Sequence, residues 1–155
     1  MKLNWKKLLI FLAIPLATGG FAALLSGGMA DYRMLNQPPL SPPGWAFPVV
    51  WTILYLAMGY ASYRIAQTNA SKQARQKALL VYGIQLFLNF LWPIVFFGMH
   101  RYLAAFFLLI ALWLMIFLTI HLFSKPDSTA ADLLIPYLLW VTFALYLNLG
   151  VYLLN

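Results

Sequence analysis

Residues 37–55, QPPLSPPGWAFPVVWTILY, join a proline-rich segment to the start of an apolar helical pattern. Proline fixes its own backbone angle and biases the residue before it toward extended structure, so this segment should be stiff. The prolines of this segment that precede the helical pattern are Pro38, Pro39, Pro42 and Pro43. We therefore expect a rigid lid over residues 30–44, followed directly by a long apolar helix.

The composition of the rest of the chain is that of a membrane protein. Of 155 residues, 64% are hydrophobic and 8% are charged, whereas a soluble domain has about 25% charged residues. A helix rises about 1.5 Å per residue and the hydrocarbon core is about 30 Å thick, so one crossing needs roughly 20 apolar residues. The segments that qualify are residues 8–29, 45–65, 78–98, 103–123 and 133–154. The sequence predicts an all-α integral membrane bundle of five transmembrane helices, with residues 1–155 forming a single domain.

Basic residues gather at one end of this predicted bundle. Of the ten lysines and arginines, eight fall in the N-terminal segment or at the second and fourth loops, and only Arg33 and Arg101 fall at the other end. The positive-inside rule then predicts a bacterial cell membrane protein with a cytoplasmic N-terminus and an external lid. The net charge of +7 needs no nucleic-acid partner, because basic flanks beside anionic membrane lipid account for it.

The N-terminus has a second interpretation, a cleaved signal peptide. Lysines precede an apolar run that has small residues behind it, as in a secretory signal. The run continues to about Met29, which is longer than an ordinary signal core. A retained first helix is therefore the favoured expectation.

Prolines occur in four of the five predicted helices. Pro48 lies in the first turn, where its missing N–H costs little, whereas Pro15, Pro93 and Pro136 lie deeper and should kink or loosen the backbone. Kinked helices can leave a cavity between them. Prolines in membrane helices also serve packing alone, and both interpretations stay open here.

Polar and aromatic residues share helical faces at bilayer depth. Within residues 78–98, one face carries Gln85, Asn89 and Trp92. Two further stripes are Trp51, Tyr55, Gly59 and Ser62, and Tyr137, Trp140, Ala144 and Asn148. Their N–H, O–H and carboxamide groups offer directional hydrogen bonds in a dry aromatic pocket, which suits a large flat ligand. Taken alone, Asn89 would more often bond a neighbouring helix than a ligand.

Residues for acid–base or metal chemistry are sparse. The chain has no glutamate, and its three aspartates lie in loops or at helix ends. His100 and His121 are separated by most of one helix, roughly 30 Å, so they cannot share a metal ion. No charged side chain lies in the middle of a predicted span, which argues against a proton relay. We expect no metal site, no required cofactor and no conventional enzyme.

Three motifs in this order resemble the TspO/translocator protein family, also called tryptophan-rich sensory proteins or peripheral benzodiazepine receptors. They are PPLSPPGWAFPVVWTILY, QLFLNFLW and LLIPYLLWVTFALYLNLGVYLLN. The resemblance covers nearly the whole chain and is nearer to bacterial members than to animal ones. It implies a five-helix bundle, commonly a homodimer, whose first loop covers a ligand pocket. The ligands it implies are porphyrins and other tetrapyrroles such as heme, and benzodiazepine-type and isoquinoline carboxamide drugs.

The resemblance also implies the residues of this pocket. Trp51 and Asn89 would be polar anchors, and the other contacts would be Tyr32, Gln37, Pro42, Pro43, Phe47, Trp92, Trp140, Ala144 and Leu147. Bacterial members are associated with light-dependent breakdown of protoporphyrin, for which Trp51 and Trp140 would be the catalytic residues. Indole is electron-rich and oxidisable beside a photoexcited ring, which is a physical reason for that role.

Two functions lead at this point, ahead of an enzyme proper and a purely structural subunit. The first is a membrane receptor or sensor that binds tetrapyrroles and promotes their photo-oxidation, and the alternative is a transporter that moves porphyrins across the bilayer through kinked helices. Sterol recognition is not expected, because the tyrosine-then-basic pattern of animal members is missing after Tyr146 and Tyr152. Arg33 is the cation nearest the lid that could meet a porphyrin propionate, although a solvated loop arginine is the simpler interpretation.

Overall fold

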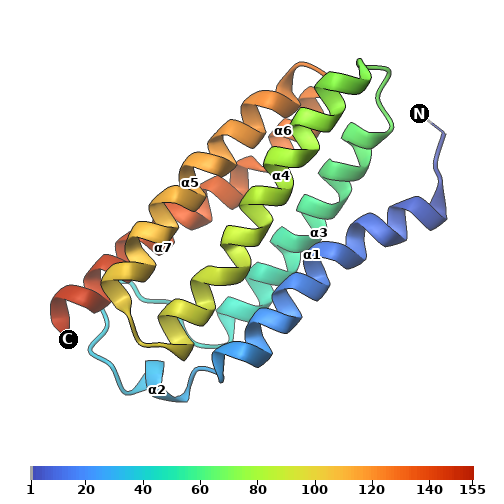
Figure 1. The fold of residues 1–155 in the computed structure, drawn as a ribbon. Coiled ribbons are helices and arrows are strands. Elements are labelled where there is room, and N and C mark those ends of the chain that lie inside the picture. The colour runs from blue at the N-terminus through green and yellow to red at the C-terminus, as the bar shows by residue number, and fades with distance from the viewer. Residues whose placement is uncertain (1) are drawn as a thin grey trace.

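The apolar runs form five membrane-length helical spans in the computed structural model, which describes residues 2–155 (Figure 1). In chain order the elements are α1 (Trp5–Ser26), α2 (Ala30–Arg33), α3 (Ala46–Ala66), α4 (Lys72–Pro93), the π-helix η1 (Ile94–Gly98), α5 (Tyr102–Ser124), α6 (Ser128–Leu133) and α7 (Ile135–Leu154). No strand occurs within these residues. The predicted all-α fold with five transmembrane helices is confirmed.

Helix boundaries differ from the predicted ones mainly where polar residues begin a span. The third span begins at Lys72 and the fifth at Ser128, six and five residues before the predicted starts at 78 and 133. The side chain of Ser71 caps α4 and that of Asp127 caps α6. These caps stabilise first turns that are polar, and a search for apolar residues does not include such turns in the span. The first span ends earlier than predicted because Gly27 adopts a left-handed φ of 80°.

The connections between spans alternate between the two ends of the bundle (Figure 1). The segment carrying α2 joins α1 to α3 at the end where α7 finishes, and we call this the lid end. The α3–α4 and α5–α6 connections lie at the opposite end, which we call the lysine end because it carries Lys72, Lys77 and Lys125.

Close contact between α1 and α3 depends on a glycine. A Cβ atom at Gly59 would lie 2.7 Å from the carbonyl oxygen of Phe11 and 2.8 Å from the Cα of Leu12. Because both are backbone atoms of α1, a side chain cannot be added without moving that helix. Gly59 therefore sets the distance at which α1 packs against α3.

Two of the three deeper prolines interrupt their spans. Pro93 ends the regular part of α4, and the chain continues as the π-helix η1. Pro136 lies in the first turn of α7 rather than deep within a helix, because the span divides at Leu134. By contrast, α1 runs without interruption through Pro15.

The proline-rich segment packs on the last turns of α7. The backbone N–H of Asn36 donates to Asn155 Oδ1 at 3.1 Å, and Asn155 Nδ2 donates to the carbonyl of Asn36 at 2.8 Å. The Tyr146 hydroxyl donates to the carbonyl of Pro39 at 2.6 Å. Pro38 lies so close to Gly150 that a Cβ atom there would be 2.5 Å from the proline ring. The lid is thus held to α7 by both hydrogen bonds and packing.

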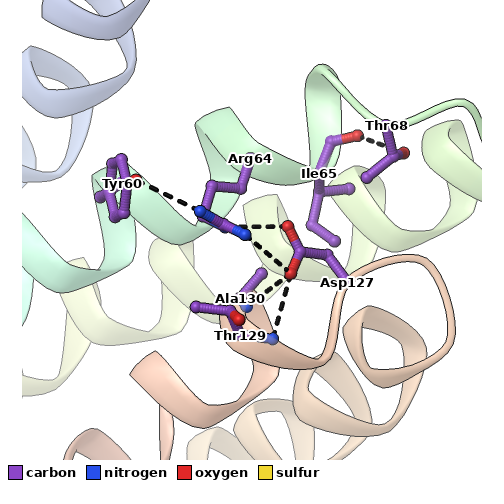
Figure 2. Close-up of polar contacts among 7 residues, drawn as sticks. All are labelled: Tyr60, Arg64, Ile65, Thr68, Asp127, Thr129 and Ala130. Carbon is purple, nitrogen blue, oxygen red and sulfur yellow. Dashed lines mark hydrogen bonds and ion pairs between the residues drawn. The ribbon is translucent and has the colours of Figure 1, made fainter. Parts of the chain in front are cut away.

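At the lysine end, an ion pair joins α3 to the start of α6 (Figure 2). Arg64 donates from Nε to Asp127 Oδ2 at 2.8 Å and from its terminal nitrogen to Oδ1 at 3.3 Å. Asp127 Oδ1 also accepts the backbone N–H groups of Thr129 and Ala130. Burial raises the pKa of the Asp127 carboxyl, but the Arg64 guanidinium and these N–H groups outweigh it and the pKa is lowered overall.

Candidate functional site

A chain of hydrogen bonds crosses the bundle between α3, α4 and α7. The Tyr55 hydroxyl donates to Asn89 Oδ1 at 2.9 Å, Asn89 Nδ2 donates to the Tyr137 hydroxyl at 2.7 Å, and that hydroxyl donates to Gln85 Oε1 at 2.7 Å. All four side chains are buried. Polar groups at this depth have no water to bond, so each needs a protein partner. The network therefore fixes the three helices relative to one another.

A second connection joins α4 to α7 nearer the lid end. The indole N–H of Trp92 donates to Asn148 Oδ1 at 2.9 Å, and Asn148 Nδ2 donates to the carbonyl of Tyr102 at 2.8 Å. Asn148 is buried, and Trp92 is nearly so. The Trp92 side chain is consequently held in one orientation.

Aromatic side chains fill the space between this connection and the lid. Tyr32 of α2 packs edge to face against two other rings. Its ring centroid lies 5.9 Å from that of Phe47 and 5.5 Å from that of Phe97. Phe47 in turn contacts Trp140 with ring centroids 6.1 Å apart. Burial raises the pKa of the Tyr32 hydroxyl. The cluster is therefore apolar and shielded from water.

Seven of the site residues inferred from the sequence converge on one small space within this cluster. They are Tyr32, Phe47, Trp51, Trp92, Trp140, Ala144 and Leu147. The space measures about 20 Å³, whereas pockets for drug-sized ligands measure about 300–1,000 Å³. The structure brings these seven residues together, but their side chains fill the volume between them.

A larger cavity of about 430 Å³ lies beside this space, between α1, α3 and the α4–η1 segment. It is bounded by Asn89 and by a run of small residues on α1, Gly19, Gly20, Ala22, Ala23 and Ser26. The two volumes share four lining side chains, which we call the aromatic partition: Phe47, Trp51, Trp92 and Phe97. A rearrangement of these side chains would join the two volumes.

Four of the ligand contacts inferred from the sequence do not line the small space. Gln37 donates to the carbonyl of Tyr32 at 3.2 Å, and Pro43 accepts from the N–H of Ala46 at the start of α3. Gln37, Pro42 and Pro43 line neither volume. Asn89 borders the larger cavity, but its carboxamide already bonds tyrosine hydroxyls at both oxygen and nitrogen.

Some residues of the larger cavity were not inferred from the sequence. They include the small residues of α1, among which Gly20 has open space where a Cβ would be. Met29 and Phe97 also line the cavity. The signal that could have found this wall is the run GGFAALLSGG at residues 19–28, in which seven of the ten residues are Gly, Ala or Ser.

The indole N–H groups of the tryptophans differ in their partners. Among residues 2–155, Trp92 and Trp113 donate to Asn148 and Thr142, whereas those of Trp51 and Trp140 have no acceptor. No three His, Cys, Asp or Glu side chains within these residues lie close enough together to hold a metal ion. Within the aromatic cluster, the indole N–H groups of Trp51 and Trp140 are therefore available as neutral donors, and Arg33 of α2 is a cation of the lid segment.

The sequence model of the TspO/MBR family matches residues 11–154. The chain belongs to the TspO/MBR family. It is 40% identical over 148 residues to the tryptophan-rich sensory protein of Cereibacter sphaeroides, covering 96% of this chain and 90% of that one. It is 41% identical over 124 residues to the tryptophan-rich protein TspO of Chlorobaculum tepidum, covering 80% and 78%. Against the translocator protein of Ovis aries it is 37% identical over 149 residues, covering 93% and 87%.

Membership of the TspO/MBR family confirms the resemblance stated from the three motifs. Together with the five apolar spans, it makes this chain an integral membrane protein. The names of its TspO/MBR relatives, sensory protein and translocator protein, support a membrane sensor or receptor role.

Proposed function

We propose that this protein is a membrane receptor that binds porphyrins and other tetrapyrroles, heme among them, beneath the lid. The observation that carries the proposal is the aromatic partition, with inferred ligand contacts on one side and a cavity of about 430 Å³ on the other. A flat apolar ring needs aromatic surfaces to stack on and few polar groups to orient it. Benzodiazepine-type and isoquinoline carboxamide drugs would occupy the same site.

Binding in this proposal requires the aromatic partition to move. The space of about 20 Å³ cannot hold a tetrapyrrole, so Trp51, Phe47 and Phe97 must turn aside and join it to the larger cavity. Trp92 stays in place because Asn148 holds its indole N–H. The unpaired N–H groups of Trp51 and Trp140 are then the donors that meet polar atoms of the ligand.

The same arrangement suits light-dependent oxidation of a bound porphyrin. In this proposal the photoexcited ring takes one electron from the indole of Trp51 or Trp140 and passes it to dissolved oxygen, which becomes superoxide. The oxidised indole then recovers an electron from the ring, and the resulting ring radical cation combines with superoxide, so that the indole is restored and oxygen is the net oxidant of the ring. No metal is involved in this step.

Porphyrin titration of the purified protein in darkness, followed by illumination, tests the proposal. Tryptophan fluorescence should be quenched saturably in darkness, and porphyrin absorbance should fall only under light. Trp51→Phe with Trp140→Phe should abolish the light-driven loss, and Trp113→Phe is the matched control because Trp113 lines neither volume. Unsaturable quenching in the unaltered protein would reject the binding site, and equal photobleaching in both variants would reject the chemistry.

A porphyrin transporter is the second candidate. Two spans are interrupted, at η1 after Pro93 and at Leu134 before Pro136, and interrupted helices form the substrate sites of many transporters. The path toward the lysine end is blocked by the Gln85, Asn89 and Tyr137 layer, which would have to open. Flux of porphyrin into sealed liposomes is the test, and a flat trace with binding retained would exclude transport.

We also propose a homodimer in a bacterial cell membrane, with the N-terminus in the cytoplasm. The family resemblance supports the dimer, and the distribution of eight basic residues against two supports the orientation. Since the chain has no cysteine, single cysteines at Lys2 and Asn36 would report sidedness cleanly. An impermeant maleimide should label Asn36→Cys from outside intact cells and leave Lys2→Cys unlabelled; the reverse pattern would overturn the orientation.

A further inference from the structure

A wide cavity of about 950 Å³ opens at the lysine end, away from the lid and the aromatic partition. It is bounded by the N-terminal segment, the α3–α4 connection, the first turns of α4 and the end of α5. The lining residues are Lys2, Gln67, Thr68, Asn69, Ala70, Ala74, Lys77, His121, Leu122, Lys125 and Pro126. Its volume lies in the upper part of the range for ligand sites, about 300–1,000 Å³.

The cavity carries positive charge that no carboxylate neutralises. Three lysines line it, and no aspartate or glutamate does. The acidic residue next to its rim, Asp127, has both oxygens engaged by Arg64 and by backbone N–H groups (Figure 2). Because Asp127 is engaged in this way, its carboxylate does not neutralise the lysines that line the cavity.

The wall of the cavity also contains a hydrogen-bond donor that has no acceptor. The Nε2 atom of Gln67 is shielded from solvent and has no acceptor among residues 2–155. Arg75, in the first turn of α4 beside this wall, has a shielded Nε in the same state. A shielded donor without an acceptor is costly. Gln67 lines the cavity, so a turn of its amide into the cavity would let a ligand that supplies oxygen acceptors satisfy this donor.

The cavity lies at the level where the spans leave the membrane. Its lining residues lie next to three span ends along the chain. These are Ala66, which ends the second span, Lys72, which begins the third, and Ser124, which ends the fourth. Leu122, Ala70 and Ala74 add apolar surface to a wall that is otherwise basic and polar. A molecule with an anionic head and an apolar body fits this combination.

We propose that this cavity binds a phosphate-bearing anion, with the three lysines and the Gln67 amide as its donors. Lysine is a strong point charge for phosphate, and basic pockets between membrane helices recognise lipid headgroups. A phosphate group supplies several acceptor oxygens at once, which matches the unneutralised lysines and the unsatisfied amide. The source is either a membrane phospholipid or a soluble phosphate, and the experiment separates the two.

Native mass spectrometry of the delipidated full-length protein in neutral detergent provides the measurement. Separate titrations use phosphatidylglycerol, phosphatidylcholine and sodium pyrophosphate. Saturable binding of phosphatidylglycerol that pyrophosphate does not displace identifies a lipid site, and displacement identifies a soluble phosphate as a ligand as well. Equal binding of phosphatidylglycerol and phosphatidylcholine, together with no binding of pyrophosphate, would overturn the proposal.

The matched variants are Lys77→Gln with Lys125→Gln, and Lys6→Gln with Lys7→Gln. Both pairs remove two positive charges at the lysine end of the bundle, but Lys6 and Lys7 do not line the cavity. We expect the first pair to weaken binding on the order of tenfold and the second to change it less than about twofold. Equal losses in the two pairs would overturn the proposal in favour of diffuse charge.

Two further variants guard against misfolding. Lys77→Arg with Lys125→Arg keeps the charge and should keep binding within about threefold of the unaltered protein. Gln67→Leu leaves every lysine in place and should weaken binding by about threefold to tenfold, because it removes the amide donor. Circular dichroism checks the fold of each variant, and unchanged anion binding in correctly folded Gln67→Leu would refute the role of that donor.

Discussion

Asn89 Nδ2 donates to the Tyr137 hydroxyl at 2.7 Å, and this hydrogen bond joins α4 to α7 in the middle of the bundle. The same asparagine accepts from Tyr55, and Tyr137 donates onward to Gln85. Asn89 therefore has a structural role whether or not a ligand also contacts it. Its position on the wall of the larger cavity means that a ligand bonding to Asn89 would compete with a tyrosine already there.

Removing the Tyr137 hydroxyl should destabilise the protein. Tyr137→Phe leaves Gln85 without its donor and Asn89 without its acceptor, which costs about 1–3 kcal/mol for groups left unpaired in a dry interior. The denaturation midpoint in detergent, measured by circular dichroism, should fall accordingly. Tyr152→Phe on the exposed face of α7 is the matched control, and an equal drop in the control would show that the network contributes nothing.

Filling the larger cavity should block porphyrin without harming the fold. Gly20→Leu adds a side chain where a Cβ meets nothing within 4 Å, and replacing an interior helical glycine gains up to about 1 kcal/mol of helix propensity. Porphyrin affinity, measured by fluorescence quenching, should fall at least about tenfold with unchanged stability. Gly83→Leu is the control, because Gly83 has equal space but does not line that cavity; undiminished affinity in Gly20→Leu would rule out the cavity as part of the site.

Loosening the lid should change how fast ligand leaves. Gly150→Ala places a Cβ 2.5 Å from the ring of Pro38, a rigid group that cannot turn aside. The lid must then shift from α7, so we expect faster hydrogen exchange in residues 34–44 and a porphyrin dissociation rate raised several-fold. Stopped-flow fluorescence measures the rate, with Gly83→Ala as control, and a rate equal to that of the control would mean that the lid does not retain ligand.

The Arg64–Asp127 pair should make stability depend on pH in the acid range. The folded-state pKa of Asp127 is lowered, so the stabilisation is complete above the unfolded pKa, near 4, and is lost as pH falls through the folded value. The midpoint of the unaltered protein should exceed that of Asp127→Asn by an amount equivalent to roughly 1–3 kcal/mol at pH 7. The gap should narrow below about pH 4, and a gap that stayed constant down to pH 2 would contradict this assignment.

The spans could be predicted because they depend on local composition. Twenty consecutive apolar residues cross a membrane whatever their neighbours are, so the five segments were found within a few residues of their observed bounds. The misplaced feature was Pro136, which was expected deep in a helix and lies in the first turn of α7. Helical periodicity alone did not reveal the division at Leu134, because apolar residues continue on both sides of it.

The candidate site was predictable only in part. The faces carrying Gln85 and Asn89, and Tyr137 and Asn148, follow from helical spacing, and the structure buries all four side chains. Spacing could not say that Asn89 would bond Tyr55 and Tyr137, since partners on other helices depend on how those helices rotate. It also could not distinguish the small residues of α1 as cavity wall from the same residues as packing surface.

The amino-acid sequence by itself determined the membrane setting, the five spans, the family and the polar faces, because each of these follows from composition, periodicity or a contiguous motif. Only the tertiary structure decided which polar groups satisfy one another and where volume is left over. It filled the space among the inferred ligand contacts, left a cavity on the far side of Trp51, and collected three lysines around another at the opposite end. Such volumes arise from the fit of several helices at once, and no single segment encodes them.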